Sequence, residues 1–460
     1  MATVQAGSSA PSLRRRLIGG GAWAIFGKGA ALALNFLTMA MVTRMLDVGS
    51  VGIYQLGQTV VLATAMVARL GLDNTVVYLV SSAVAEGSPA RAWRAVRTVS
   101  ILGACGALAA WALLSLGGVD LLGHLLARGS FARLPQIAAA MGVWTAAVAI
   151  QLLTSEALRG FHAIRDAVIY GGVVAGVLTV VALAFVGHDG HLSLSAAAWT
   201  TALSTSVAAV VAAAALFLRA RRAGPLGPES GHGYAGVLRR SLPVLVSNAM
   251  TFVLTNVDVW VVGGFSSGRE LALYATPAKL VTLIGVSFLI ANQVLPPLIG
   301  ELAAKKDNVL MERTLRGTAF VVGLPSMAVV LVFVLAGGPL LRVVFGPAYA
   351  GGATVLALLC IGQAANILTG SSLFALLMTG HGVAAMWISG TMGLLAGAAC
   401  LVAVHFWGPT GVAAAVSAVV VLQQLVTLLV ARRLVGVWTH VSASAALGEV
   451  RRMLAERAAR

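Results

Sequence analysis

The chain has 460 residues, of which 59% are hydrophobic and only 10% are charged, whereas charged residues make up about 25% of an average soluble domain. This composition excludes a soluble enzyme, and the 13 prolines and the aperiodic glycines exclude a disordered or collagen-like chain. The formal net charge is +16, which in a soluble protein would raise the question of nucleic acid. Long apolar runs, in place of short alternating strands, predict an all-α polytopic membrane protein.

The first apolar run follows Arg14, Arg15 and Arg16 and is too long for the core of a signal peptide, so we expect it to be the first span. Twelve runs are long enough to cross about 30 Å of hydrocarbon. In chain order they cover residues 17–43, 53–84, 98–118, 135–157, 167–187, 194–218, 242–265, 271–299, 317–337, 353–378, 383–406 and 410–431. An even number of spans places both termini on one side of the membrane.

The basic residues fix the direction of these spans. With both termini inside, 23 of the 31 Lys and Arg residues fall in inner segments and five in outer segments. This bias predicts cytoplasmic termini. It explains most of the net charge as topology and contact with anionic lipid, so no nucleic-acid partner is expected. The outer loops, of which the longest covers residues 117–134, leave no room for a soluble catalytic domain, and we expect no enzyme and no catalytic residue.

Cysteine usage gives no sign of a metal or redox site. The three cysteines are Cys105, Cys360 and Cys400, and all of them lie within apolar runs without CxxC spacing. We therefore expect neither a disulfide nor a bound metal.

An internal repeat divides the chain. Features of the first half recur roughly 220 residues later: Tyr54 and Tyr274, Gly160 and Gly380, Gly172 with Gly176 and Gly393 with Gly397. Six spans per copy give a parallel repeat about an axis along the membrane normal, which is typical of transporters. The predicted parts are an N-terminal six-helix lobe over residues 1–222, a cytoplasmic linker over 223–240, a C-terminal six-helix lobe over 241–433 and a basic amphipathic cytoplasmic tail over 434–460.

Short stretches in both halves carry a family resemblance. They are Gly21-Ala22-Trp23, Asn35-Phe36, Thr43-Arg44-Met45-Leu46, Val51-Gly52-Ile53-Tyr54, Gly71-Leu72-Asp73, Ser241-Leu242-Pro243, Asn256-Val257-Asp258, Leu273-Tyr274 and Leu295-Pro296. In order and spacing, from Arg14 to Arg433, the chain resembles the polysaccharide-transporter (Wzx-like) lipid-linked oligosaccharide flippases of the multidrug/oligosaccharidyl-lipid/polysaccharide exporter superfamily.

The resemblance implies a multi-pass protein of the bacterial plasma membrane. Such a protein flips undecaprenyl-pyrophosphate-linked oligosaccharide from the inner to the outer leaflet, by alternating access of two lobes around a cationic cavity, for cell-surface polysaccharide biosynthesis. Its partners would be the lipid-linked oligosaccharide, membrane lipids and other polysaccharide-assembly proteins. No cofactor is implied beyond coupling to H⁺ or Na⁺.

Charges within spans are the candidate site residues, because each costs roughly 2.5 to 3.5 kcal/mol at a span centre. Lys28 lies twelve residues beyond Arg16, near the middle of the first span, and is expected to contact an anionic substrate or to pair with a carboxylate on another span. Asn35 shares its helical face and belongs to the same polar cavity. Lys279 is the second candidate phosphate contact, the alternative being a side chain that extends to the headgroups.

Arg69 is a third candidate cavity cation, and Asp73 stands four residues later in the same predicted span. The two can pair across one helical turn, either as a structural pair or in substrate binding and ion coupling. Asp258 is either a second coupling carboxylate or a counter-ion to Lys279 or Lys28. Polar candidates for the cavity are Asn256, Asn292 and Gln293, of which Asn292 and Gln293 could equally link helices.

Two other functions compete with the flippase. A cation-coupled multidrug exporter of the same superfamily would use acidic groups toward cationic drugs, whereas the spans here contain three cations and only Asp73 and Asp258 as central carboxylates. A membrane glycosyltransferase or polymerase predicts a large outer loop, and the short outer loops count against it. The charge balance favours an anionic substrate.

Overall fold

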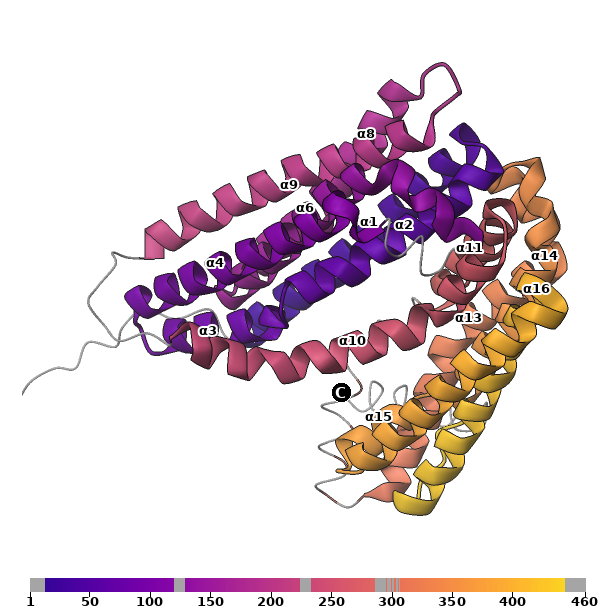
Figure 1. Ribbon diagram of the computed structural model, residues 1–460. Helices are drawn as coiled ribbons and strands as arrows, with labels where there is room; N and C mark the ends of the chain where they lie inside the picture. The colour runs from indigo at the N-terminus through magenta and orange to yellow at the C-terminus, as the bar shows by residue number, and fades with distance from the viewer. Residues whose placement is uncertain are drawn as a thin grey trace, which may run out of the picture. The chain divides into compact units, whose positions relative to one another are not determined.

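The computed structural model describes residues 13–119, 129–223, 233–285 and 307–442, together with Leu295, Ile299, Leu302 and Lys305 (Figure 1). Every regular element in this part of the chain is a helix. The elements are α1 (Leu13–Met45), α2 (Val48–Ala68), α3 (Leu72–Ala85), α4 (Pro89–Leu113), η1 (Leu114–Gly118), η2 (Gly129–Ile137), α6 (Ala138–Gly160), α7 (Ile164–Val168), η3 (Ile169–Val173), α8 (Val174–Val186), α9 (Leu194–Ala223), α10 (Tyr234–Phe265), α11 (Gly268–Ile284), α13 (Asn308–Phe345), η4 (Pro347–Gly352), α14 (Ala353–Thr369), α15 (Ser372–Met378) and α16 (Gly382–Leu434).

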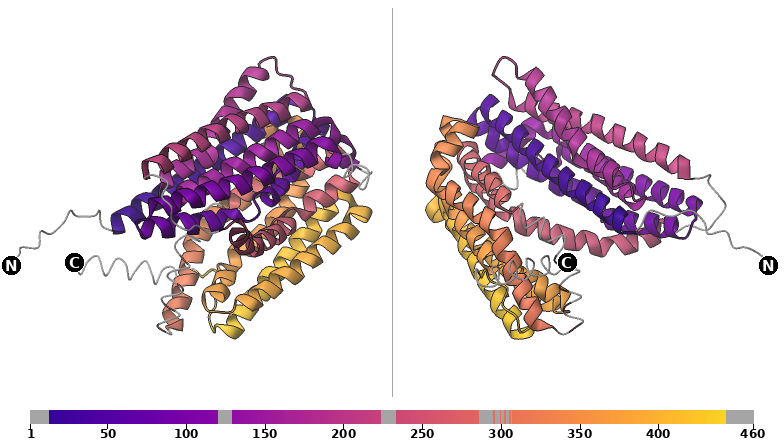
Figure 2. Two further views of the ribbon diagram at one scale, coloured as in Figure 1. Left: turned by 60° about the vertical axis from the view of Figure 1, so that its left-hand side comes forward. Right: turned by 180° about the vertical axis from the view of Figure 1, so that it is seen from behind.

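Ten helices in the described part are long and apolar enough to cross a membrane, in agreement with an all-α polytopic fold. One of them, α16, has 53 residues and is broken at Gly408 (φ 59°, ψ −152°), directly before Pro409. Its two segments lie side by side (Figure 2). The break falls between the predicted spans 383–406 and 410–431. Most of residues 286–306 are not described, so the count of twelve spans and the side of the termini stay predictions.

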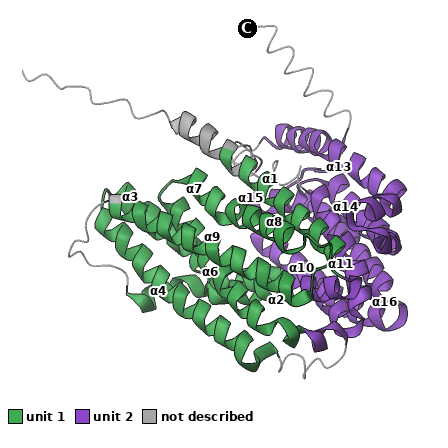
Figure 3. Cartoon of the chain, turned by 90° about the horizontal axis from the view of Figure 1, so that it is seen from above, with its two compact units in different colours: residues 1–46, 57–122, 134–252 green, residues 47–56, 123–133, 253–460 purple. Residues whose placement is uncertain are grey.

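The helices pack as two compact units (Figure 3). Unit 1 comprises Met1–Leu46, Gly57–Leu122 and Leu134–Phe252, and unit 2 comprises Asp47–Leu56, Gly123–Arg133 and Val253–Arg460. The division of the chain into lobes at 1–222 and 241–433 remains a prediction from the sequence. Residues 224–232 of the predicted linker and 443–460 of the predicted tail lie outside the described part of the chain.

In unit 1, α6 packs against α3, α4 and α9. Leu72 and Val76 of α3, Val99 of α4 and Leu158 of α6 are among the buried side chains of this core. The small and aliphatic residues of these apolar runs pack closely between the helices. Two polar side chains of α6 bind backbone carbonyls at the π-helical segment η3 and just before it: Gln151 Nε2 donates to Tyr170 O at 2.9 Å and Ser155 Oγ donates to Ala167 O at 2.7 Å.

Glycine allows two helix pairs to approach closely. A Cβ on Gly176 of α8 would lie 2.8 Å from Cβ of Leu34 in α1, and one on Gly393 of α16 would lie 2.1 Å from Cδ2 of Leu254 in α10. One member of each repeated glycine pair therefore lies at a close contact between helices, as small residues in spans often do. At Gly172 and Gly397 an added Cβ would make only ordinary contacts.

Unit 2 is built from α11, α13, α14 and α16 with their connecting turns. The carboxylate of Asp307 caps α13 by accepting from the Leu310 N–H at 2.9 Å. Ser267 and Glu270 form a capping box at the start of α11. These caps satisfy backbone N–H groups that a helix start leaves without partners.

Candidate functional site

Lys28 and Asn35 lie on α1 in unit 1, and both side chains are exposed. Seven residues separate them, so they project within about 20° of each other around the helix. The amide of Asn35 donates to the carbonyl of Ala31 at 2.9 Å, within its own helix. No ion pair of the described residues includes Lys28. The shared polar face predicted from the sequence is present, and its part in a cavity stays a prediction.

Arg69 and Asp73 form an ion pair of 2.7 Å, with side chains 15% and 16% exposed. The predicted span 53–84 is not one continuous helix, because Leu70 (φ 52°) and Gly71 (φ 70°) take left-handed backbone conformations between α2 and α3. The two charges therefore bridge a break in the helix. Arg69 also donates from Nε to Ala65 O at 3.2 Å, so the guanidinium ties the end of α2 to the start of α3.

The packing around Gly71 explains the break. A Cβ there would lie 2.3 Å from the carbonyl oxygen of Ser241 in α10, which together with the positive φ leaves room only for glycine. Glu156 of α6 interacts electrostatically with both Arg69 and Asp73 and forms its own pair with Arg159 at 3.2 Å. Unit 1 thus holds a cluster of two arginines and two carboxylates at this kink.

In unit 2, Asp258 and Tyr274 form a polar contact between two helices. The hydroxyl of Tyr274, which is fully buried, donates to Asp258 Oδ2 at 2.7 Å and links α10 to α11. Asn256 donates from Nδ2 to the hydroxyl of its neighbour Thr255 at 3.2 Å. The sequence singled out Asp258 but not Tyr274, although the recurrence of a tyrosine at positions 54 and 274 was a signal.

Lys279 is half-buried on α11, and its backbone carbonyl accepts from Thr282 Oγ1 at 2.7 Å. Lys279 belongs to unit 2 and Lys28 to unit 1, so their roles as two contacts of one substrate stay a prediction. The predicted polar residues Asn292 and Gln293 lie outside the described residues.

Segments related by the internal repeat meet in unit 2, which sequence reasoning did not foresee. They are the start of α2, residues 48–56, and the start of α11, residues 268–276. A Cβ on Gly52 would lie 2.0 Å from the carbonyl oxygen of Gly268, so the backbones touch. Gln55 Nε2 donates to Thr276 Oγ1 at 3.0 Å in a buried contact.

Asp47 precedes α2 at this point. Burial alone would raise the pKa of its carboxyl, but hydrogen bonds from Ser50 and the charge of Arg133 outweigh burial and lower it. The Ser50 N–H donates to Asp47 Oδ2 at 2.8 Å. An ionised carboxylate here stabilises the start of α2.

A second feature missed from the sequence is the segment 435–442, which follows α16 and is called the C-terminal strap below. Two of its contacts are with α13. The Trp438 N–H donates to Glu312 Oε2 at 3.1 Å, and Nε2 of His440 lies 3.1 Å from Arg316 Nη2, within hydrogen-bond distance. Thr439 donates to the Thr369 carbonyl at 2.7 Å at the end of α14. Burial and the charge of Arg316 lower the pKa of His440, against an opposing effect of Glu312. The available signal in the sequence was Glu312, which stands one residue before Arg313 and four before Arg316. These arginines were counted only among the basic residues that fix the direction of the spans.

Solved structures share this fold. An inward-facing multidrug resistance MATE family transporter of the MOP (multidrug/oligosaccharidyl-lipid/polysaccharide) superfamily matches with a TM-score of 0.72 and 16% identity, over 88% of this chain and 94% of the other. The lipid II flippase MurJ in an inward closed conformation matches with a TM-score of 0.67 and 11% identity, over 88% and 87%. A MOP superfamily transporter from Pyrococcus furiosus matches with a TM-score of 0.56 and 17% identity, over 91% and 95%.

The helical units and these likenesses define the class by its fold: a helical protein with the fold of MOP superfamily transporters, in which ten helices of the described part are long and apolar enough to cross a membrane. The chain belongs to the polysaccharide biosynthesis protein family, whose model matches residues 17–303. The family resemblance expected from the sequence is thereby confirmed. No curated protein sequence matches the chain.

Proposed function

We propose that this protein flips undecaprenyl-pyrophosphate-linked oligosaccharide from the inner to the outer leaflet of the bacterial plasma membrane, by alternating access, for cell-surface polysaccharide biosynthesis. Membership of the polysaccharide biosynthesis protein family supports the pathway. The likeness to a lipid II flippase supports a lipid-linked substrate on this fold. Other polysaccharide-assembly proteins would supply and consume the substrate.

The observation that carries the proposal is the state of the charges within the spans. Both central carboxylates are engaged within the protein, Asp73 by Arg69 and Asp258 by Tyr274. Lys28 is exposed and takes part in no ion pair of the described residues. A cation held within a span is costly unless it faces water or a partner. A pyrophosphate group passing α1 is a partner of the required charge.

The alternative is a cation-coupled multidrug exporter, which the MATE family likeness supports equally at the level of the fold. It requires a carboxylate free to meet a cationic drug. In the flippase, Asp73 and Asp258 would instead couple transport to H⁺ or Na⁺, and Asn35, Asn256, Asn292 and Gln293 would hydrogen-bond the glycan.

The test uses liposomes that contain the purified protein and a fluorescent polyprenyl-pyrophosphate oligosaccharide. A membrane-impermeant quencher should reach about half of the label in empty liposomes and more than half when the protein is present. Lys28→Ala should slow this exposure and Lys28→Arg should keep it. Lys305→Ala is the matched control, because Lys305 is an exposed lysine outside the long helices.

Two outcomes oppose the proposal. Equal quenching with and without protein, for several glycans, would reject the flippase. Gradient-driven uptake of a cationic dye that persists in Lys28→Ala but fails in Asp258→Asn would support the exporter.

A further inference from the structure

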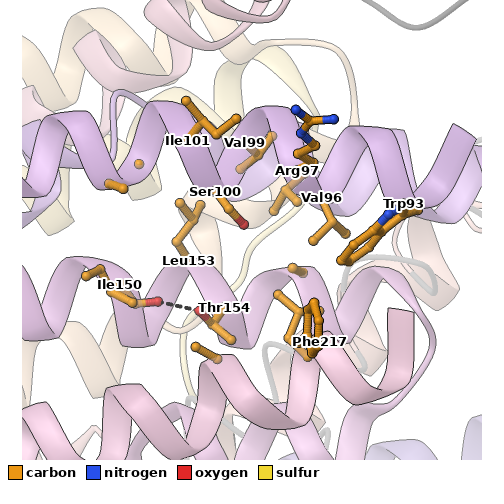
Figure 4. Close-up of a pocket in the computed structure, with 16 residues that line it drawn as sticks. Trp93, Val96, Arg97, Val99, Ser100, Ile101, Ile150, Leu153, Thr154 and Phe217 are labelled. Atoms are coloured by element: carbon orange, nitrogen blue, oxygen red, sulfur yellow. Dashed lines mark hydrogen bonds between the residues drawn. The ribbon is translucent and has the colours of Figure 1, made fainter. Parts of the chain in front are cut away.

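A pocket of about 390 Å³ lies inside unit 1, between α3, α4, α6 and α9 (Figure 4). Its volume falls in the range of about 300 to 1,000 Å³ that small-molecule sites occupy. Apolar side chains such as Val76, Val96 and Leu153 form its walls. None of the charged candidate residues of the transport site lines it, so it is separate from the site discussed above.

The polar groups of the pocket are few. Thr154 donates its hydroxyl to the carbonyl of Ile150 at 2.7 Å, within α6 (Figure 4). Ser100 is the other hydroxyl among the lining residues. A glycan needs many hydrogen-bond partners, and an apolar chain needs none. The lining therefore suits a hydrocarbon chain.

The pocket opens on the outer surface of the bundle. The lining residues Ile101 and Ala104 of α4 and Ala213 and Phe217 of α9 are exposed. The same two helices expose large apolar side chains next to the opening, among them Leu108 of α4 and Val210 and Leu218 of α9. In a membrane-spanning helix such surfaces face hydrocarbon, so a lipid chain can enter sideways.

One end of the opening carries positive charge. Arg97 is the charged residue that lines the pocket, and its guanidinium points away from α6 (Figure 4). Arg221 lies with its guanidinium carbon 4.3 Å from the ring centre of Phe217, which is itself 5.8 Å from the ring of Trp93. None of the described lining residues is a carboxylate. Basic pockets between transmembrane helices are typical sites for anionic headgroups.

We propose that this pocket binds one acyl chain of an anionic membrane phospholipid, with the headgroup phosphate outside the pocket against Arg97 and Arg221. A methylene group has about the volume of a water molecule, roughly 30 Å³, so the pocket holds on the order of a dozen carbons. That is most of an acyl chain but a small part of an undecaprenyl chain. The bound lipid would fill the space between α4, α6 and α9 and stiffen unit 1.

The test is native mass spectrometry of the purified protein with phosphatidylglycerol or phosphatidylcholine added. Wild type should retain one phosphatidylglycerol per chain with preference over phosphatidylcholine. Ala104→Phe, which fills the pocket, should lose this lipid, whereas Ala109→Phe on an exposed position of α4 away from the pocket should keep it. Ala213→Phe and Ala214→Phe are the equivalent pair on α9 and serve if a variant of α4 fails to fold.

The headgroup is tested separately. Arg97→Gln should lower the occupancy of phosphatidylglycerol about tenfold and remove its advantage over phosphatidylcholine, whereas the exposed Arg239→Gln should do neither. Retention of the lipid by both Ala104→Phe and Ala213→Phe would overturn the proposal. Displacement by undecaprenyl phosphate but not by excess phosphatidylglycerol would also overturn it and assign the pocket to the substrate tail.

Discussion

The side-chain amide of Gln55 donates a buried hydrogen bond of 3.0 Å to the hydroxyl of Thr276, although 221 positions separate the two residues. That separation is close to the roughly 220-residue period of the internal repeat. The contact therefore joins the two segments that the predicted repeat relates, the starts of α2 and α11. Beside it, Gly52 approaches the backbone of Gly268 so closely that a single methyl group does not fit.

Gly52→Ala should destabilise the protein, because its Cβ would lie 2.0 Å from the Gly268 carbonyl oxygen. Forcing a methyl group into such a contact costs about 1 to 3 kcal/mol. Thermal unfolding in detergent measures the loss. Gly29→Ala is the control, since no atom lies within 4 Å of its added Cβ. Equal unfolding temperatures for the two variants would show that the backbones do not meet here.

Substitutions of Arg69 and Asp73 should have non-additive effects on the free energy of unfolding. Removal of one partner from a fully buried ion pair costs about 3 to 5 kcal/mol. This pair is partly buried, so Asp73→Asn and Arg69→Gln should each destabilise unit 1 by less than that. The double variant should recover much of this loss, as thermal unfolding would show. Loss of the exposed pair of Arg219 and Asp166, 45% and 40% exposed, should change stability by less than about 1 kcal/mol.

A transport assay distinguishes a structural role of the pair of Arg69 and Asp73 from a role in ion coupling. If Asp73 couples transport to an ion, the double variant regains stability but not gradient-driven flipping. Recovery of both properties would assign the pair to the fold alone.

Tyr274→Phe should leave Asp258 without the hydroxyl that donates to it at 2.7 Å. An acceptor that loses its donor at a partly buried position costs about 1 to 3 kcal/mol. Tyr349→Phe is a matched control, because the buried hydroxyl of Tyr349 has no hydrogen-bond partner among the described residues. Chemical denaturation should show the first variant weakened and the second unchanged or stabilised.

The C-terminal strap should loosen in acid. Burial and Arg316 lower the pKa of His440 in the folded protein, so the unfolded chain binds a proton more readily. Stability is then complete above the unfolded histidine pKa of about 6.5 and decreases as the pH falls below it. His440→Gln should reduce the fall in unfolding temperature between about pH 8 and about pH 5.5, the range that contains this pKa. His191→Gln, at an exposed position, should leave the fall unchanged.

Hydropathy predicted most helices because crossing hydrocarbon requires long apolar runs, and Pro409 marked the break in α16. It did not predict the interruption at Leu70 and Gly71, since leucines on both sides keep the run apolar. The left-handed conformation there follows from contact with α10, which is distant in sequence.

Site residues followed the same rule. Lys28, Arg69 and Lys279 were visible because charges are rare in these spans. Their partners were not, apart from the local pair with Asp73. The hydrogen bond from Tyr274 to Asp258 and the contacts of the C-terminal strap join separate helices. Contacts between separate helices cannot be derived from a single sequence.

The break at Gly408 leaves α16 almost without a loop, because a single residue departs from helical backbone between its two segments. The turn between α8 and α9 spans residues 187–193 and includes exposed residues such as His188 and His191. A protease or an inserted epitope tag needs several residues of exposed, extendable chain. Tags for mapping the membrane topology therefore belong at residues 187–193, and an insertion at Gly408 would unwind a helix before it could be detected.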